Sequence, residues 1–349
     1  MLREYPESKW IDCFARAFSL SGVDEEKTVA ILSETQSRPV LVELSEYALA
    51  QLGASSLTLK LPTQPLDHSI PTRSTGSSKA LEGYDFLTHS LASCDLIIDV
   101  TVEGQLHSPA LQKVLRQGGR LLMISNEHPE VLERCMPAPE LKGRVDRSLS
   151  FLTAAREMVV TSEAGTNLKV NIQDAPSRGG AGFLLPEQNV AYWPAGLALC
   201  FPVSNTCNGQ LVFDVGDVNL TFKKYFESRV TAHFENDFIT SIEGNGLDAQ
   251  LLRDYYARWN DQNAYAISHV GWGLNPNALW ESLMMYDKTQ INGTELRAIE
   301  GSFMISTGAN EHAGRFTSCH FDFPMRNCTV ALDGFRVVDN GKLAAEICK

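Results

Sequence analysis

The segment Thr317–Cys328 places an imidazole and a carboxylate in an apolar setting. It reads TSCHFDFPMRNC, so His320 and Asp322 alternate with Phe321 and Phe323. Residues two apart in a strand project to the same face, which would put His320 and Asp322 side by side. A buried ionised carboxylate is costly unless it is paired or bound to a metal. The spacing alone favours a hydrogen-bonded His–Asp pair at the edge of a core, with a metal site as the alternative.

His269 is a candidate third ligand. It lies in NAYAISHVGWGLNP (263–276), an apolar, glycine-rich stretch. Two neutral imidazoles and one carboxylate that leave coordination positions open form the facial triad of non-haem Fe(II) oxygenases. The same ligand types can bind zinc for hydrolysis. Taken alone, a histidine in such a stretch is more often a hydrogen-bonded core residue, so convergence of His269 with His320 is a hypothesis for the structure to test.

A second candidate region is the loop EGQLHSPAL (103–111), which contains His107. The loop follows the apolar run CDLIIDV (94–100), and Ser108 and Pro109 then begin a helix as N-cap and first helical residue. Open α/β sheets bind ligands outside the carboxyl ends of their strands. A histidine there, with an ordinary pKa near 6.5, could transfer protons. The alternative is a histidine on a surface loop.

The stretch LRAIEGSFMISTGAN (296–310) contributes two further polar candidates. Arg297 could fix an anionic or enolate oxygen, because its guanidinium is forked and always charged. Ser306 begins an S-T-G turn and could hydrogen-bond a substrate. The alternatives are a surface ion pair and an ST-turn, both of which are common. The chain has no GxGxxG, P-loop, H-E-x-x-H or G-x-S-x-G motif, which counts against nucleotide binding and serine hydrolase chemistry.

The elements that must position these residues alternate in type over the first half of the chain. Short apolar runs alternate with stretches of helical periodicity, and continuous apolar runs indicate strands buried on both faces. This alternation predicts an α/β fold with an open, mostly parallel sheet and crossover helices. The predicted strands are 27–33, 55–61, 94–100 and 119–125, and the predicted helices between them include 39–53 and 108–119.

The pattern changes after about residue 157. A helical stretch leads into a predicted hairpin at 158–172, and short strands separated by Gly, Pro and Asn follow. The clearest later helix is LDAQLLRDYYARW (247–259). We therefore predict an N-terminal α/β domain over 1–156 and a β-rich, α+β C-terminal metal-binding domain over 157–349.

Composition limits the partners of this 349-residue chain. Thirty basic against 42 acidic side chains give a net charge of -12, which argues against nucleic acid and anionic membranes as partners. The N-terminus shows no signal-peptide pattern, and no apolar run is long enough to span a bilayer. Eight cysteines without a C-x-x-C pair are typical of reduced thiols, which predicts a cytoplasmic protein acting on a small substrate.

Eight collinear segments together resemble one family. They are LHSP, PEVLER, YWPAG, FDVGD, LLRDYYARWND, ISHVGWGLNP, STGAN and CHFDFPMRNC. In order and spacing, from about residue 12 to about residue 335, they are similar to the bacterial 2,5-dihydroxypyridine 5,6-dioxygenases. Members of that family are iron enzymes that act late in nicotinate and nicotine breakdown, and they share a fold with the M29 aminopeptidases.

The resemblance implies a metal centre and a reaction. His269, His320 and Asp322 match the three Fe(II) ligands of the family. The implied reaction is extradiol-type insertion of O2, which opens a dihydroxypyridine ring to N-formylmaleamate. The implied partners are a small aromatic or N-heterocyclic substrate and O2, and the implied assembly is a homo-oligomer.

The resemblance also implies a substrate pocket and shows where this chain departs. Leu106 and His107 match the loop that packs on the substrate and serves it as acid/base, and Arg297 and Ser306 match residues near the bound ring. The family carries a Glu and a His before its W-P-x-G turn, where this chain has glycines and Tyr192. We therefore include Tyr192 among the substrate-binding candidates. The tail KLAAEICK also lacks an aromatic lid, so the identity of the ring stays open.

An M29-like metallo-aminopeptidase is the alternative function. Such an enzyme needs a two-metal site with additional carboxylates. The glycine-rich stretch 177–185 lacks a glutamate where those enzymes have one, which counts against this alternative. A catalytically inactive relative that binds a small ligand is a third possibility.

Overall fold

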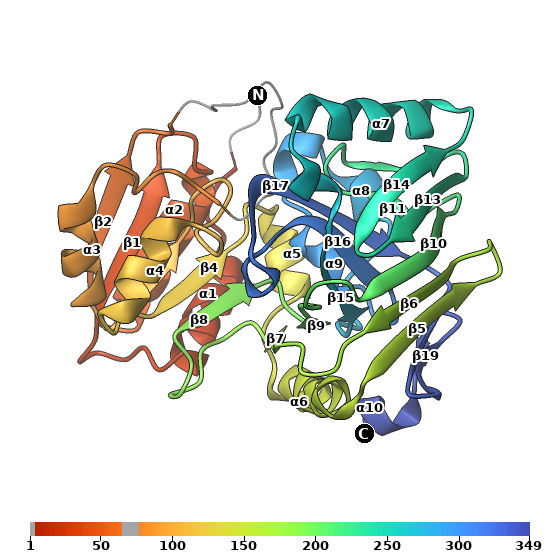
Figure 1. Cartoon of the computed structure of the whole chain (residues 1–349). Coiled ribbons are helices and arrows are strands. Elements are labelled where there is room, and N and C mark those ends of the chain that lie inside the picture. Colours follow the sequence, from red (N-terminus) through yellow and green to blue (C-terminus); the bar gives the residue numbers. More distant parts are fainter. Residues whose placement is uncertain (1–3, 65–76) are drawn as a thin grey trace.

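The computed structural model describes residues 4–64 and 77–349, and these form two lobes (Figure 1). One lobe is built on a parallel sheet with the strand order β2-β1-β3-β4-β8. The other contains two antiparallel sheets. The predicted α/β fold class, with a mostly parallel N-terminal sheet and a β-rich second part, is confirmed. The boundary between residues 156 and 157 stays a prediction.

All pairs in the parallel sheet run in the same direction. The four predicted strands are present, and a fifth comes from beyond residue 157. That fifth strand is β8, a short VAYW segment that pairs with β4 at the edge of the sheet. The strands are β1 (Thr28–Glu34), β2 (Ser55–Leu61), β3 (Leu96–Asp99), β4 (Leu121–Ile124) and β8 (Val190–Trp193).

Helices cover both faces of this sheet, which explains why its central strands are continuously apolar. The helices α1 (Ser8–Leu20) and α2 (Pro39–Gln51) share a core with alternate strand residues such as Ile31. The helices α3 (Asp85–Ala92) and α4 (Pro109–Arg116) share a separate core with the intervening residues, such as Leu32.

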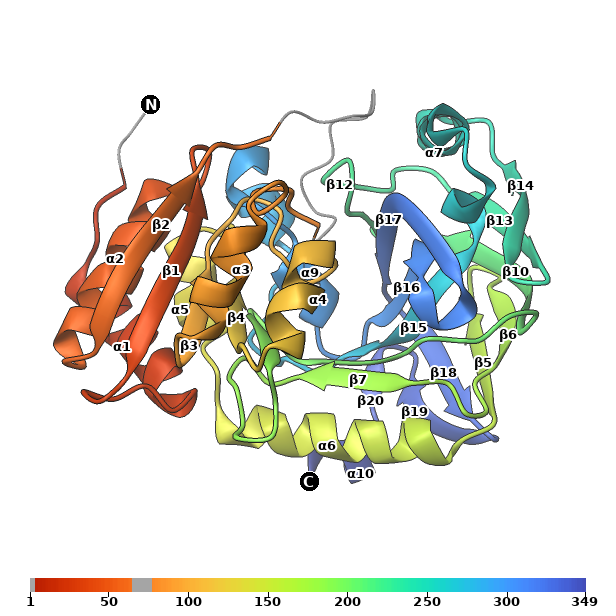
Figure 2. The same ribbon diagram turned by 60° about the vertical axis from the view of Figure 1, so that its left-hand side comes forward.

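Two helices lead from this lobe to the next. The short helix α5 (Pro129–Arg134) follows β4, and α6 (Pro139–Ala154) then runs beneath β7 (Figure 2). The Trp272 indole N–H donates to the Ser148 hydroxyl of α6 over 3.2 Å. The helix α6 therefore packs directly on the sheet that carries the candidate ligands.

The second lobe contains an eight-stranded sheet, β14-β13-β10-β6-β5-β18-β19-β20, and a five-stranded sheet, β17-β16-β15-β9-β7. The predicted hairpin at 158–172 and the predicted helix at 247–259 are both confirmed. The strands of the larger sheet are β5 (Glu157–Ser162), β6 (Asn167–Asn171), β10 (Cys207–Phe213), β13 (Val230–Glu235), β14 (Phe238–Glu243), β18 (Cys328–Leu332), β19 (Phe335–Asp339) and β20 (Lys342–Leu343).

The five-stranded sheet is the one that positions the site. Its strands are β7 (Ser177–Gly180), β9 (Leu197–Cys200), β15 (Ile267–Gly273), β16 (Phe303–Asn310) and β17 (Arg315–Met325). A small ribbon pairs β11 (Val218–Asn219) with β12 (Lys224–Tyr225). The remaining helices are α7 (Leu247–Trp259), α8 (Ser282–Met285), α9 (Thr294–Ala298) and α10 (Ala345–Cys348), with 3-10 turns at Gln262–Tyr265, Lys288–Gln290 and Glu311–Ala313.

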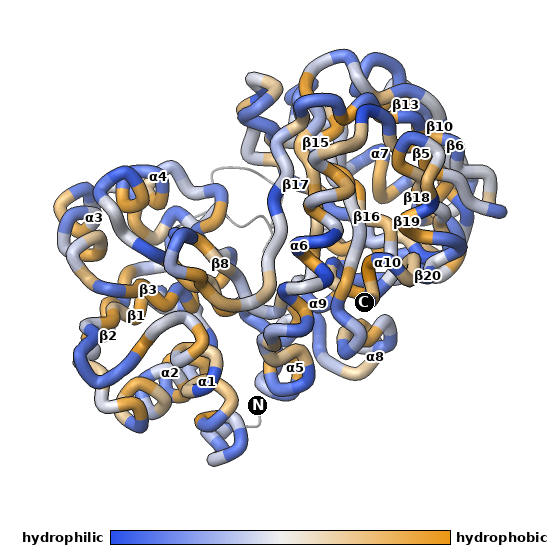
Figure 3. Tube along the Cα trace, turned by 90° about the horizontal axis from the view of Figure 1, so that it is seen from below, coloured by the Kyte–Doolittle hydropathy of each residue, from blue (hydrophilic) through white to orange (hydrophobic). Residues whose placement is uncertain are grey.

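One aromatic core joins the two antiparallel sheets. Phe213 of β10 and Phe323 of β17 lie with ring centroids 4.5 Å apart, and Phe321 and Phe323 lie 4.2 Å apart. Apolar residues follow the inner strands of both lobes, and hydrophilic residues gather at the outer turns (Figure 3). The alternation in HFDF therefore has a structural cause, since Phe321 and Phe323 fill the core while His320 and Asp322 face away from it.

Within residues 4–64 and 77–349, none of the helices combines the length and the apolar character that a membrane crossing requires.

Two phenylalanines on one strand give a matched test of this packing. Phe321 is 0% exposed and Phe316 is 72% exposed, both on β17. We expect Phe321→Ala to lower the free energy of unfolding by about 3–5 kcal/mol, because it leaves a cavity among packed rings. Phe316→Ala should change it by about 0.5 kcal/mol or less. Urea unfolding followed by fluorescence measures both, and equal losses would contradict the packing described.

Candidate active site

The structure brings His269, His320 and Asp322 together. One potential ligand atom from each lies within 4.8 Å of the others. The Nε2 atoms of His320 and His269 lie 3.3 Å and 3.5 Å from Oδ1 of Asp322. Two imidazole nitrogens and one carboxylate oxygen on one side of a sheet are the donor set that suits a divalent transition metal with open coordination positions.

Strand pairing explains how distant residues meet. The strand β16 lies between β15 and β17, with Gly308 opposite His320 and Ser306 opposite Asp322. The register of β15 against β16 shifts between Ile267 and Val270, so a bulge contains His269. Bulges re-aim side chains beside functional sites. The Ser306 hydroxyl accepts the backbone N–H of His269 over 3.2 Å, and this bond holds the bulged residue to the middle strand.

Gly308 permits the close approach of β16 and β17 at this point. Its backbone φ of +114° lies in a region that residues other than glycine rarely adopt. A Cβ atom at this position would lie 2.0 Å from the carbonyl oxygen of Cys319, directly before His320. Glycine is therefore required beside the histidine.

Asp322 is the most buried charge of the site. Its Oδ2 accepts the Nε–H of Arg297 over 2.6 Å. Its Oδ1 is buried and accepts no hydrogen bond from the described residues. Burial favours the neutral acid, but the neighbouring His320 and Arg297 outweigh it and hold the pKa of Asp322 well below its ordinary value. The side chain is therefore a carboxylate with one oxygen already bound and the other directed at the two imidazoles.

His269 is held in the form that can bind a metal. Burial, which outweighs the opposing charge of Asp322, lowers the pKa of His269 to about 3. At neutral pH its imidazole is therefore neutral, with a lone pair available to a cation. The Nδ1 atom is buried and has no hydrogen-bond partner among the residues described.

A cavity of about 170 Å³ lies beside these three residues, between the lobes. A cavity of about 150 Å³ is large enough for benzene, so this one is the size of a single substituted ring. Its apolar wall consists of Leu106, Met123, Leu197, Leu199, Phe201 and Met304. Its polar wall consists of Glu103, His107, Arg178, Tyr192, Asn292, Thr294 and Arg297, together with the three candidate ligands.

His107 reaches this cavity from the parallel-sheet lobe. Its ring centroid lies 5.1 Å from that of His320. Two effects lower the pKa of the His107 imidazole: desolvation by the surrounding residues of the chain is the larger, and the charge of His320 is the second. The side chain of His107 is exposed and lines the cavity, so it can contact whatever the cavity holds.

Asp99 anchors the loop that carries His107, and sequence reasoning missed it. It is fully buried at the end of β3, where Oδ1 accepts the Thr101 N–H over 3.0 Å and Oδ2 accepts the Gln105 N–H over 2.7 Å. Gly104 has a φ of +79°, and a Cβ there would lie 2.1 Å from the Met123 sulfur. An acidic residue directly at the end of a buried strand is the sequence signal that could have identified this anchor.

Tyr192, which lines the cavity, lies in close contact with Gly180. Tyr192 projects from β8, and a Cβ at Gly180 would lie 2.6 Å from its Cζ atom. The ring of Tyr192 therefore occupies the space that any side chain at position 180 would need. Burial raises the pKa of the Tyr192 hydroxyl, which is thus a neutral hydrogen-bonding group at the cavity wall.

Of the residues singled out from the sequence, all but one line the cavity. Ser306 is the exception, because it is fully buried beneath the site and its hydroxyl is engaged by His269. Those that do line it are Leu106, His107, Tyr192, His269, Arg297, His320 and Asp322.

Fold and site together define a class: two-lobed α/β proteins in which a two-histidine, one-carboxylate group faces a ring-sized cavity between the lobes. The family model described as 2,5-dihydroxypyridine 5,6-dioxygenase matches residues 9–345. The chain belongs to the 2,5-dihydroxypyridine 5,6-dioxygenase family.

Relatives and solved structures agree with this membership. A 2,5-dihydroxypyridine 5,6-dioxygenase from Pseudomonas putida KT2440 is 36% identical over 340 residues, or 95% of each chain. The solved structure of 2,5-dihydroxypyridine dioxygenase from Pseudomonas putida KT2440 superposes with a TM-score of 0.91 at 34% identity, over 99% of this chain and 100% of that one. AmpT from Thermus thermophilus matches with a TM-score of 0.66 at 14% identity, over 97% and 99% of the two chains, which shows the shared M29-like fold alone.

These comparisons bear on the class of activity. The chain is an enzyme of the dioxygenase class, that is, an oxidoreductase whose reactants are a small molecule and O2. With the three-ligand group, this class indicates a metal-dependent enzyme. The metallo-aminopeptidase alternative is not favoured, since the whole-length family match and the relative that is 36% identical are dioxygenases.

Proposed function

We propose that the protein is an Fe(II)-dependent, extradiol-type dioxygenase that opens 2,5-dihydroxypyridine, or a closely related hydroxylated ring, and converts 2,5-dihydroxypyridine to N-formylmaleamate. Family membership supports the reaction. The observation that carries the metal assignment is the buried Oδ1 of Asp322, which faces two imidazole nitrogens at 3.3 Å and 3.5 Å and accepts no hydrogen bond in the described structure.

The residues present fit a ferrous ion. A carboxylate oxygen that is buried without a partner costs free energy, and a cation held with His269 and His320 would remove that cost. When bound, Fe(II) supplies open positions that bring a ring hydroxyl and O2 together and a charge that lowers the pKa of the hydroxyl. We assign His269, His320 and Asp322 as its ligands, and Arg297 as the residue that orients Asp322.

His107 is the proposed acid/base. Its imidazole is neutral and lies on the cavity wall beside His320, so it can accept the proton of a ring hydroxyl and return it to the oxygenated ring. Because Asp99 fixes the loop on which it lies, this proton transfer needs little reorganisation.

Apolar and polar walls would hold the ring in place. Leu106 and Phe201 would pack on the ring and exclude water from it, which strengthens the electrostatic interactions of the site. The hydroxyl of Tyr192 and the guanidinium of Arg297 would hydrogen-bond ring substituents. Ser306, predicted as a substrate contact, is better placed to hold His269 on its bulge.

The setting we propose is a cytoplasmic homo-oligomer. All eight cysteines are free thiols, and all but Cys94 and Cys348 are buried, which suits a reducing compartment. Size-exclusion chromatography with light scattering measures the oligomeric state, and a monomeric mass would contradict that part of the proposal.

The metal assignment predicts a specific loss of activity. Protein reconstituted with Fe(II) without oxygen should bleach the ring absorbance of 2,5-dihydroxypyridine when O2 is added, and chelation should abolish this turnover. His320→Ala should lower kcat/KM by at least ~100-fold, because altering residues that merely support metal ligands already costs 10–100-fold.

The matched control is His312→Ala, at a histidine whose ring lies 5.4 Å from that of Phe201 but which does not line the cavity. This variant should keep its iron and its turnover. Full activity of His320→Ala would refute the proposed metal centre.

The contact between Gly180 and Tyr192 predicts a change in substrate binding. Gly180→Ala should force the Tyr192 ring into the cavity, because the new methyl would lie 2.6 Å from Cζ. A change of one methyl in an apolar pocket is worth about 10–200-fold, so we expect KM for the ring substrate to rise about tenfold. Gly143→Ala, in helix α6 and away from the cavity, is the control. An unchanged KM in Gly180→Ala would show that the Tyr192 wall does not contact the substrate.

A further inference from the structure

The short helix α9 connects the lobes and carries Arg297, the residue bonded to Asp322. Five residues are too few for a helix to be stable by itself. Leu296 and Ala298 are fully buried, so both apolar side chains of α9 pack into the protein. Thr294 and Glu295, at the start of α9, are bound by residues from the parallel-sheet lobe, so the position of Arg297 depends on contacts that lie outside the candidate site.

The first of these contacts is made by Glu127, which follows β4. Its carboxylate accepts the backbone N–H groups of Asn292, Gly293 and Thr294 over 3.0, 2.7 and 2.8 Å. Glu127 is buried, with 1% of its surface exposed. A side chain of one lobe therefore caps the N-terminus of a helix of the other, where a negative charge is most favourable.

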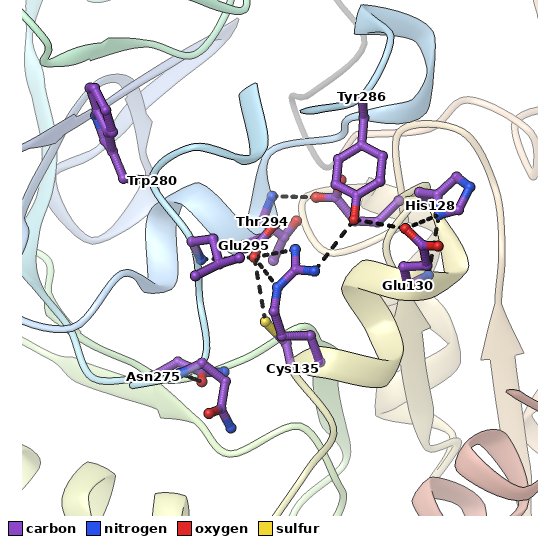
Figure 4. Close-up of polar contacts among 12 residues, drawn as sticks. His128, Glu130, Cys135, Asn275, Trp280, Tyr286, Thr294 and Glu295 are labelled. Atoms are coloured by element: carbon purple, nitrogen blue, oxygen red, sulfur yellow. Dashed lines mark hydrogen bonds and ion pairs between the residues drawn. The ribbon is translucent and has the colours of Figure 1, made fainter. Parts of the chain in front are cut away.

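The second contact joins Arg134 of α5 to Glu295 of α9. The Nε and Nη2 atoms of Arg134 donate to Oε1 of Glu295 over 3.1 and 2.8 Å. The same oxygen accepts the Leu279 N–H over 2.9 Å. The Nη1 atom of Arg134 donates to the Tyr286 hydroxyl over 3.3 Å, and that hydroxyl donates to Glu130 over 3.1 Å. Figure 4 labels Glu295, Tyr286 and Glu130 within this group of polar contacts.

Glu295 and Arg297 are two residues apart in the five-residue helix α9. A shift of Glu295 therefore moves Arg297, whose Nε donates to Oδ2 of Asp322 over 2.6 Å. With Oδ2 occupied, the other oxygen of Asp322 faces His269 and His320. A continuous series of contacts therefore connects Arg134 of α5, through α9, to the carboxylate of Asp322.

We infer that Arg134 and Glu295 are positioning residues, which set the orientation of Asp322 through Arg297. Neither residue lines the cavity. The inference rests on the proposed function, because it takes Asp322 to be a metal ligand. It also couples the packing of the two lobes to metal affinity, since Arg134 belongs to one lobe and Asp322 to the other.

Binding of Co(II) to the metal-free protein tests this inference without any turnover. Partners that support metal ligands contribute about 10–100-fold to affinity, so Arg134→Gln should weaken Co(II) binding about tenfold. In an Arg297→Gln background the same change should have less than about a twofold effect, because its route to Asp322 is already broken. The affinities come from titrations followed by Co(II) absorption in the four variants of the cycle.

Arg134→Gln leaves the buried carboxylate of Glu295 without its charged partner, so this variant could misfold. A second variant is therefore needed to separate misfolding from the proposed effect. Arg134→Lys keeps the charge but lacks the fork that bonds Glu295 and Tyr286 together. It should weaken Co(II) binding by a smaller factor, and again only when Arg297 is present.

The control is another ion pair of equal burial. Arg134 and Glu295 have side chains 21% and 2% exposed, and Lys224 and Asp248 have side chains 20% and 2% exposed. Lys224→Gln should lower the melting temperature, as loss of any such pair does, but leave Co(II) affinity within about twofold.

Three results would overturn the inference. Equal weakening by Arg134→Gln whether or not Arg297→Gln is also present would show that Arg134 does not act through Arg297. Equal weakening by Lys224→Gln would show a general effect of stability. Failure of the unaltered protein to bind Co(II) would instead remove the proposed metal centre, and the inference with it, and this failure is visible before any variant is made.

Discussion

The structure depends on one electrostatic constraint, the buried carboxylate of Asp322. An ionised group in the protein interior must be compensated, and here Arg297 binds one oxygen while the imidazoles of His269 and His320 face the other. The compensation in the described structure is incomplete, because Oδ1 lacks a hydrogen-bond donor. In the function we propose, a metal cation is the partner that completes it, so the same buried carboxylate oxygen that is costly without a partner would bind the metal.

The two lobes contribute different parts of the chemistry. The antiparallel sheet supplies the candidate ligands on the two strands that flank β16, with the glycine at 308 and the bulge at His269 setting their approach. The carboxyl edge of the parallel sheet supplies His107, Met123 and Tyr192, as expected for ligand sites of open α/β sheets. Neither lobe alone encloses a ring, which is why contacts between them, at Glu127 and Arg134, bear on the geometry of the site.

The sequence predicted those parts of the fold and site that depend on local pattern. Short apolar runs, of which 94–100 is nearly continuous, identified four parallel strands, and the alternation in HFDF placed His320 and Asp322 on one face of β17. Features that depend on contacts between residues far apart in the sequence could not be predicted. The segment VAYW is too short to predict its place in the parallel sheet, and nothing near Ser306 indicates that His269 occupies its hydroxyl. Likewise, the clash that pairs Gly180 with Tyr192 exists only in the folded chain.

The central claim is that three side chains from two strands hold one ferrous ion, and anomalous diffraction at the iron edge tests it most directly. Crystals would be grown without oxygen from protein loaded with Fe(II). The account predicts a single anomalous peak bounded by Nε2 of His269, Nε2 of His320 and Oδ1 of Asp322, with its open side toward the cavity. A peak elsewhere on the molecule, or none at this position in protein that retains its iron, would contradict the account.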